Sequence, residues 1–208
     1  YVLCFNGEIY NFRDLASDIN KDLKIKSDTE LILHAFSKFG INESINKFIG
    51  MFAIAVWDKY EEKLTLIRDR MGEKPLYYGL IDNCFIFSSE LKSFKKFPII
   101  DLKINHKSVN YYFSRMNVPS PFTIYNDIFK LEPGGLIELK PNDLKNKCVY
   151  IKDNEVFANK VKAKKIWWST FKLFNKKNFK PDNYLNTKKQ ITSMLNTSVE
   201  NMLKTDVK

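Results

Sequence analysis

Four short runs rich in β-branched and aromatic residues place the strongest limit on the fold of this chain. They lie between Met51 and Ser89 and cover residues 52–57, 64–68, 76–80 and 85–88. Short polar segments at 58–62 and 82–83 separate two pairs of these runs, as turns do in antiparallel hairpins. The pattern therefore predicts consecutive antiparallel strands that build a meandering sheet.

Helical patterns flank these strands and do not alternate with them. Leu15 and Ile19 lie four residues apart in a polar background, which predicts a short helix over 12–21. Ser27 precedes an apolar run and Glu30 follows Ser27 by three residues, which is typical of a capped helix start. Further helices are expected after Glu90, over 106–114 and over 186–204. Because helices and strands are segregated along the chain, we expect an α+β domain.

The first residues combine a strand-like apolar run over 2–6 with Asn6-Gly7, a dipeptide common in tight turns. The same dipeptide suits acyl transfer at an amide. The Asn6 side-chain amide and the Gly7 N–H, side by side, can form an oxyanion hole for a tetrahedral intermediate. The carboxylates of Glu8 and Asp28 can hold the ammonium group of an amino-acid substrate. Taken alone, Asn-Gly also fits an ordinary turn, and Asp28 fits a helix cap.

The segment 140–184 is rich in Lys and Asn and lacks a regular period, apart from a strand candidate at 166–168. We expect a linker or an insertion there. After Gly134-Gly135, a strand is expected over 136–139. Near the end of the chain, apolar residues at helical spacing mark one face of the helix expected over 186–204: Ile191, Leu195, Val199 and Met202.

Charge and cysteine content exclude several classes of function. The net charge of +10 is spread along the chain, which does not favour a nucleic-acid partner. The densest basic stretch, 160–165, reads as a solvated loop. No apolar run approaches the ~20 residues that cross a bilayer, so we expect no membrane partner. Three scattered cysteines, Cys4, Cys84 and Cys148, predict a reduced cytoplasmic protein without a metal site, with Cys4 and Cys84 buried.

Taken together, the motifs follow the order and spacing of a known family. The sequence resembles the class II glutamine amidotransferase domain of glutamine-hydrolysing asparagine synthetases, which belongs to the N-terminal-nucleophile hydrolases. The resemblance covers residues 1 to 139 and the C-terminal helix, and rests on the segments 5–11, 27–30, 50–53, 57–58, 68–72, 74–78, 87–92, 118–119 and 131–134.

This resemblance implies a fold and a division into domains. The implied fold is a four-layer αββα arrangement that is truncated at its N-terminus and followed by the first helix of an α/β synthetase domain. The implied domains are a partial glutaminase domain over 1–139, a linker or insertion over 140–184, and the first helix of the synthetase domain over 185–208.

The resemblance also implies roles for individual residues. By position, Asn6 and Gly7 match the oxyanion hole, and together with Glu8 they match part of the glutamine-binding residues. Asp28 matches a further ligand of the glutamine backbone groups. We assign Arg68 and its neighbour Asp69 a structural role.

In this family an N-terminal cysteine attacks glutamine, and the ammonia released amidates aspartate in a second domain that uses ATP and magnesium. Here residue 1 is Tyr1, so we expect the nucleophile and the ATP loop to lie outside these 208 residues. Cys4 should not replace the nucleophile, because its side chain should point into the sheet packing. The intact parent is expected to bind glutamine, aspartate, ATP and Mg, and to form a homodimer.

Two alternatives stay open from the sequence. A related amidotransferase could act on a sugar or another carboxylate, because the missing second domain chooses the acceptor. A non-catalytic module of the same fold could instead bind a partner. Neither the 208 residues nor their spacing separates these from an asparagine synthetase.

The 208-residue chain is expected to bind no cofactor and to release no ammonia from glutamine, since neither an N-terminal cysteine nor an ATP loop is present in it. A coupled ammonia assay on the purified polypeptide checks this. Release above the rate of a buffer blank would contradict the prediction.

Overall fold

The computed structural model describes residues 1–19, 25–81, 84–97, 101–145, 149–152, 155–158, 161–171 and 183–203. Its strands are β1 Val2–Ile9, β2 Gly50–Asp58, β3 Lys63–Arg68, β4 Tyr77–Ile81, β5 Cys84–Ser88, β6 Ile128–Lys130, β7 Gly135–Leu139, β8 Val149–Lys152, β9 Glu155–Ala158, β10 Val161–Lys162 and β11 Lys164–Ile166. Its helices are α1 Phe12–Ile19, α2 Asp28–Phe39, α3 Ile41–Lys47, α4 Leu91–Phe94, α5 His106–Arg115, α6 Pro141–Lys145 and α8 Tyr184–Met202. The α+β class is confirmed.

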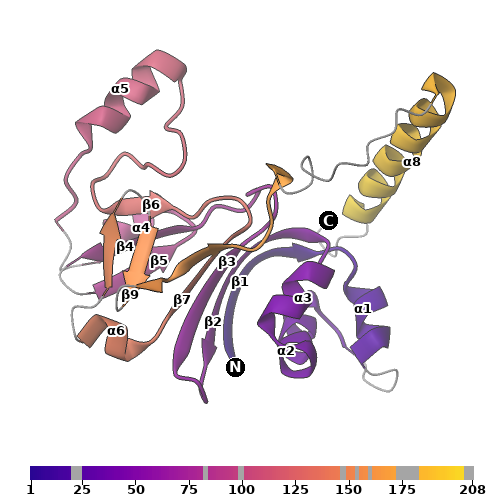
Figure 1. Cartoon of the computed structure of the whole chain (residues 1–208), viewed down its shortest axis with the longest axis horizontal. Coiled ribbons are helices and arrows are strands. Elements are labelled where there is room, and N and C mark those ends of the chain that lie inside the picture. Colours follow the sequence, from indigo (N-terminus) through magenta and orange to yellow (C-terminus); the bar gives the residue numbers. More distant parts are fainter. Residues whose placement is uncertain are drawn as a thin grey trace. The chain divides into compact units, whose positions relative to one another are not determined.

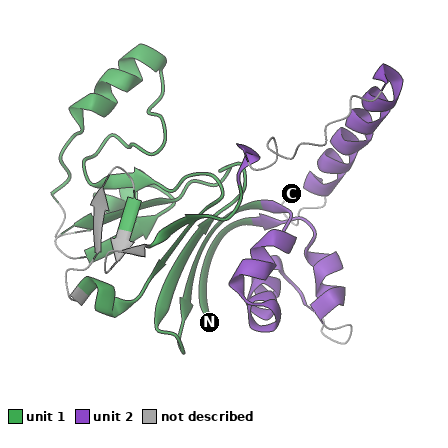
Figure 2. Cartoon of the chain, viewed as in Figure 1, with its two compact units in different colours: residues 1–7, 51–168 green, residues 8–50, 169–208 purple. Residues whose placement is uncertain are grey.

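The chain divides into two compact units (Figure 2). Unit 1 contains residues 1–7 and 51–168, and unit 2 contains residues 8–50 and 169–208. The division therefore falls inside β1 and at the first residue of β2.

Unit 1 contains most of the strands (Figure 1). A five-stranded sheet has the order β1-β2-β3-β7-β11, and a three-stranded sheet has the order β5-β4-β6. A third sheet has the order β10-β9-β8. The hairpins β2-β3 and β4-β5 are antiparallel, as the sequence predicts.

The expected single meander is wrong. β3 pairs with β7, which follows it by more than sixty residues in the sequence, and β4 leaves for the second sheet. The reason lies in the segment between β3 and β4: the Arg68 guanidinium and the Asp69 carboxylate bind its backbone and hold it as an irregular loop. Such a loop cannot close a tight hairpin.

Within unit 1, the five-stranded and three-stranded sheets share one hydrophobic core, as the expected pair of packed sheets requires. The five-stranded sheet contributes side chains from β2, β3 and β7, and the three-stranded sheet contributes Tyr78. Around Tyr78 lie the rings of Phe85 and Phe129, with centroids 6.1 and 6.0 Å away. The other buried members are Ala53, Ala55, Leu66, Leu76, Leu131, Ile137, Leu139, Val156 and Ala163.

Unit 2 contains the two helices expected before residue 50, α1 and α2, and also α3, which the sequence analysis did not predict. α2 contacts both α1 and α3 (Figure 1). Ser27 caps α2 as predicted, because its side chain accepts a hydrogen bond from the Glu30 N–H at 3.2 Å. Gly40 ends α2 at a φ of 75°. The expected helix over 12–21 is confirmed up to Ile19, and its last two residues lie outside the described part of the chain.

We expected the segment 140–184 to be irregular, and over its first half this expectation is wrong. The segment contains α6 and the strands β8 to β11, and β11 pairs with β7 at the edge of the five-stranded sheet. The strand candidate at 166–168 overlaps β11 only at Ile166. Residues 172–182 lie outside the described part. The domain boundaries at 139 and 184 stay predictions.

The helix expected over 186–204 is confirmed as α8, and Lys204 lies outside the described residues. Its apolar face is exposed: Ile191, Leu195 and Val199 have 53%, 61% and 55% of their surface accessible. Among the described residues, none of the helices has both the length and the apolar character needed to cross a bilayer.

A charge ladder crosses the edge of the five-stranded sheet at β3, β7 and β11. Glu138 on β7 accepts hydrogen bonds from Lys63 on β3, at 2.9 Å, and from Lys165 on β11. Burial opposes ionisation of Glu138, but the two lysines outweigh it and hold its pKa below the usual range. The folded state therefore favours the ionised carboxylate.

Glu138→Gln is expected to lower the free energy of unfolding by about 1 kcal/mol at pH 7. Because the folded pKa is lowered, this contribution is present above the unfolded value of about 4.3 and disappears as pH falls through the folded pKa. Urea unfolding of the 208-residue chain at pH 7 and pH 3 measures it. Glu61→Gln is the control, since Glu61 pairs with Lys140 at 62% exposure. An equal loss for Glu138→Gln at both pH values would contradict this account.

Candidate functional site

The Asn6-Gly7 segment lies inside β1 and does not form the turn that we expected. Side chains alternate along the strand, so Cys4 and Asn6 are exposed while Phe5 is half-buried. β1 runs on to Ile9, which is buried. The strand therefore presents the Asn6 amide on an accessible face.

Gly7 allows a close approach between two backbones in unit 1. Its φ is +153°, and a Cβ built at this position would lie 2.1 Å from the Met51 carbonyl oxygen and 2.7 Å from the Phe52 Cα. No L side chain fits that space. The requirement for glycine thus comes from the contact with β2, a long-range relation that the local sequence pattern does not show.

Asn6 has the freedom that an oxyanion donor needs. Within the described residues its side chain makes no hydrogen bond, and it is exposed. The predicted donors, the Asn6 amide and the Gly7 N–H, belong to adjacent residues of unit 1.

Both described cysteines are exposed, so the prediction that Cys4 and Cys84 are buried is wrong. Cys4 projects on the same face of β1 as Asn6, about 6.8 Å along the strand, because residues two apart share a face. It does not point into the sheet packing, which was our reason to exclude it as a nucleophile. Cys148 lies outside the described part of the chain.

Glu8 and Asp28 belong to unit 2, and the structure ties Asp28 to the residue after Glu8. The Ile9 N–H donates to Asp28 Oδ2 at 3.3 Å, and the Thr29 N–H donates to Asp28 Oδ1 at 2.7 Å. The N-cap of α2 is Ser27, so Asp28 is not the helix cap that its residue type also suggested. The structure thus brings Asp28 to the strand that carries the motif.

Glu8 is half-buried, and its side chain has no hydrogen-bond partner among the residues that the structure describes. Its backbone is closely confined: a Cβ on Gly50 would lie 2.0 Å from the Glu8 carbonyl oxygen. A carboxylate that has no hydrogen-bond partner in the described part of the chain, on a fixed backbone, suits the binding of an ammonium group.

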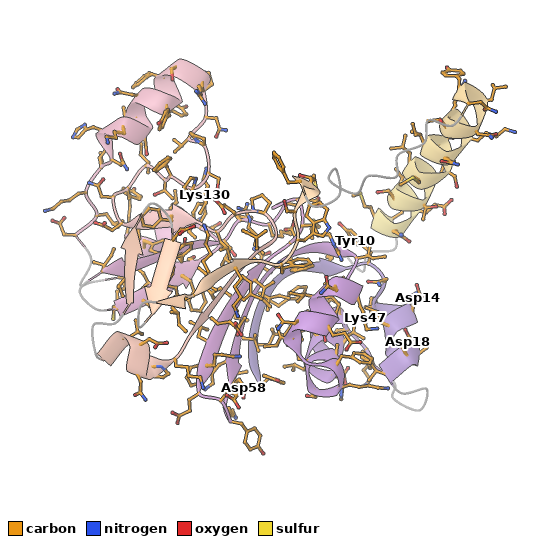
Figure 3. All side chains as sticks on the ribbon, in the orientation of Figure 1. Tyr10, Asp14, Asp18, Lys47, Asp58 and Lys130 are labelled. Carbon is orange, nitrogen blue, oxygen red and sulfur yellow. The ribbon has the colours of Figure 1, made fainter. Side chains whose placement is uncertain are left out.

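Asn11, which sequence reasoning treated only as part of a motif, fixes the segment beside Glu8. Its Nδ2 donates to the Lys47 carbonyl at 3.0 Å, and its Oδ1 accepts from the Ile49 N–H at 2.9 Å. The Tyr10 N–H donates to the Ile49 carbonyl at 2.8 Å. Tyr10 and Lys47, the last residue of α3, are labelled in Figure 3. The sequence shows that an Asn is present, but it does not show that this Asn binds a donor and an acceptor of one turn.

The described residues include no group of three or more His, Cys, Asp or Glu side chains that could hold a metal ion. Within unit 1, the Asn6 amide and the Gly7 N–H are groups of the kind that donate to an oxyanion. Within unit 2, Glu8 and Asp28 are carboxylates of the kind that bind a positively charged group.

A family model described as a glutamine amidotransferase domain matches residues 1–151. A putative glutamine-hydrolysing asparagine synthetase 2 of Methanocaldococcus jannaschii is 41% identical over 133 residues, which are 63% of this chain and 26% of the relative. Asparagine synthetase 1 of Bacillus subtilis is 32% identical over 184 residues, 87% of this chain and 25% of the relative. The human asparagine synthetase is 32% identical over 167 residues, 69% of this chain and 29% of the relative.

This chain thus spans between a quarter and three tenths of the length of these relatives. Among solved structures, an allosteric regulatory enzyme of purine biosynthesis covers 67% of this chain with a TM-score of 0.48 and 19% identity. The glutamine phosphoribosylpyrophosphate amidotransferase of B. subtilis covers 67% with a TM-score of 0.47 and 19% identity.

Gly7→Ala is expected to lower the free energy of unfolding by roughly 2–4 kcal/mol, because the new methyl group meets the Met51 carbonyl. Gly40→Ala is the matched control: Gly40 also has a positive φ, but no atom lies within 4 Å of its Cβ position. That control carries only the cost of its backbone conformation, with φ 75° and ψ 165°, which is about 1–3 kcal/mol, so it should lose less stability than Gly7→Ala. Urea unfolding followed by circular dichroism measures both, and equal losses would show that the close contact at Gly7 is unimportant.

Proposed function

The chain belongs to the family of glutamine amidotransferase domains, and we propose that it contributes the oxyanion hole and the amino-acid contacts of a glutamine-hydrolysing site in a longer asparagine synthetase. The observation that carries this proposal is the continuity of Asn6, Gly7 and Glu8 on β1, with Asp28 hydrogen-bonded to the next residue of the same strand. Two donors and one carboxylate thereby belong to consecutive residues of one strand, and a second carboxylate binds the residue that follows them.

The roles follow from charge. When a nucleophile attacks the glutamine carboxamide, negative charge develops on its oxygen, and the Asn6 amide and the Gly7 N–H can donate to it. The α-ammonium of glutamine is a cation, and Glu8 and Asp28 can accept its hydrogen bonds. Asp28 retains acceptor capacity, because a carboxylate offers about four lone pairs and three are used, by the Ile9 N–H, the Thr29 N–H and the Thr29 hydroxyl.

The proposed reaction converts glutamine and water to glutamate and ammonia. We propose that a cysteine thiolate outside the 208 residues is the nucleophile and that this chain alone is inactive. Because Cys4 is exposed on the face that carries Asn6, it requires a direct control. In the full-length protein, Cys4→Ser should leave the rate of ammonia release unchanged within about twofold.

For the full-length protein we propose an ATP-dependent amidation of aspartate with the ammonia produced, with ATP and Mg bound by other parts of the chain. A homodimer belongs to the same proposal. The support is the similarity to proteins named glutamine-hydrolysing asparagine synthetases, one of which aligns with 87% of this chain. The exposed apolar face of α8 fits a helix that packs against a further domain.

We expect two substitutions in the full-length protein, Glu8→Gln and Asp28→Asn, to raise KM for glutamine about tenfold or more. Each should change kcat less than KM. The ammonium contact binds substrate and transition state alike, so its loss weakens binding before it slows the chemical step. Steady-state ammonia release measures both constants.

Glu43→Gln serves as the control, because Glu43 is an exposed acidic residue of unit 2 that pairs with Lys47 at 3.3 Å. It should leave KM unchanged. If KM for glutamine stays at the wild-type value in both Glu8→Gln and Asp28→Asn, the assignment of these carboxylates to the substrate fails.

A further inference from the structure

Asp69, at the end of β3 in unit 1, holds both backbone groups of Phe52 on β2. The Asp69 N–H donates to the Phe52 carbonyl at 2.8 Å, and Asp69 Oδ2 accepts from the Phe52 N–H at 3.3 Å. Asp69 is 0% exposed, and so is Phe52. The residue therefore fixes the position of Phe52 from two sides.

A side-chain hydrogen bond replaces one backbone hydrogen bond at the end of the β2–β3 ladder. The β2–β3 ladder pairs Ala53 with Arg68, so the next pair is Phe52 with Asp69. In a regular antiparallel pair the Asp69 carbonyl would accept from the Phe52 N–H. Here the side chain accepts, and the Asp69 carbonyl accepts instead from the N–H groups of Gly72 and Gly134, at 3.2 and 2.7 Å.

The Asp69 carboxylate is itself held in place. The Glu73 N–H donates to Oδ1 at 3.0 Å, and the Lys74 N–H donates to Oδ2 at 2.9 Å. A buried carboxylate is costly unless it is hydrogen-bonded, and three backbone donors meet this one. Its two oxygens cannot move without the loss of one of these bonds.

The fixed position of Phe52 also limits where the backbone of Gly7 can lie. A Cβ built at Gly7 would lie 2.7 Å from the Phe52 Cα and 2.1 Å from the Met51 carbonyl oxygen, so the backbones of β1 and β2 are in close contact there. The Phe52 ring stacks on Trp167 with centroids 6.3 Å apart and planes at 17°, which fixes the side chain as well.

We propose that Asp69 is a positioning residue for the oxyanion donor at Gly7: through the backbone of Phe52, it sets where the β1 backbone lies at that residue. This inference rests on the proposed role of Gly7 in glutamine hydrolysis. It gives Asp69, which we first regarded only as structural, a specific effect on the chemical step.

The test is Asp69→Asn in the full-length protein. The substitution keeps the size of the side chain but replaces one acceptor oxygen with an NH₂ group, which then faces a backbone N–H. We expect kcat for ammonia release to fall about 10–100-fold, since a displacement near 1 Å can cost about 10²-fold. KM for glutamine should change less than about threefold, because no hydrogen bond joins Asp69 to Glu8 or Asp28 in the described part of the chain.

Asp58→Asn is the matched control. Asp58 is the last residue of the same strand β2 and accepts from the N–H groups of Tyr60 and Glu61, at 2.9 and 3.0 Å (labelled in Figure 3). It makes the same kind of side-chain contact to backbone donors, but in the β2–β3 turn. Its kcat and KM should stay within about twofold of the wild type.

A second variant covers the case in which Asp69→Asn does not fold. Trp167→Leu removes the ring stacked on Phe52 and the indole N–H that donates to the Arg68 carbonyl, but it leaves the hydrogen bonds of Asp69 in place, so it should lower kcat about threefold to tenfold with KM unchanged. If the folded variants keep the wild-type kcat, or if KM rises as much as kcat falls, the positioning role is wrong while the proposed function stands.

A wild-type protein that releases no ammonia from glutamine would instead overturn the proposed function. The link from Asp69 to Gly7 is then measured on the 208-residue chain, by amide hydrogen exchange at Phe52 and by the amide chemical shifts of Gly7. Asp69→Asn should accelerate exchange at Phe52 about tenfold or more and shift the Gly7 amide resonances, and Asp58→Asn should do neither. Unchanged exchange in Asp69→Asn would overturn the positioning role.

Discussion

The backbone hydrogen bonds accepted by the buried Asp69 carboxylate are the constraint on which much of unit 1 depends. They end the β2–β3 ladder at Phe52, and they free the Asp69 carbonyl to bind Gly72 and Gly134. The chain can therefore leave the five-stranded sheet after β3, enter the second sheet at β4, and return to β3 through β7. The Asp69 carboxylate ends the ladder, and the Arg68 guanidinium helps it to hold the loop that follows. A carboxylate suits this task, because its several lone pairs can serve donors from two separate segments.

The two sets of candidate groups are held by different means. In unit 1, the position of Gly7 comes from backbone packing against Met51 and Phe52, and a glycine is the requirement. In unit 2, the backbone beside Glu8 is held by side chains that bind backbone groups, namely Asp28 to Ile9 and Asn11 to the turn before Gly50. Both means leave the side chains of Asn6 and Glu8 without a hydrogen-bond partner among the described residues. Fixed backbones that carry uncommitted polar groups are what a preorganised polar site needs.

Local features of this fold could be predicted from the sequence, and long-range ones could not. Ser27 and Glu30 specify the start of α2 because a capping box involves only neighbours in the chain. The pairing of β3 with β7 depends on a loop geometry set by Asp69, which no periodicity shows. The same limit applies to the site. Residue types marked Asn6 and Glu8 as candidates, whereas the reason for Gly7 is a contact with a strand more than forty residues away. The exposure of Cys4 was misjudged because apolar neighbours in sequence say little about which face of a strand is covered.

The structural unit that supports Gly7 extends beyond residue 151, where the match to the family model ends. β11 pairs with β7, and the Trp167 N–H donates to the Gly134 carbonyl at 2.9 Å, while the Gly134 N–H donates to the Asp69 carbonyl at 2.7 Å. The Trp167 indole N–H also donates to the Arg68 carbonyl at 3.1 Å, and the Arg70 guanidinium lies 5.2 Å from its ring. Residues 164–168 therefore touch the same loop that Asp69 organises. A segment that composition describes as a linker is, by its hydrogen bonds, part of the framework behind the candidate oxyanion hole, because the edge of β7 and the ring of Phe52 would otherwise lack their neighbours.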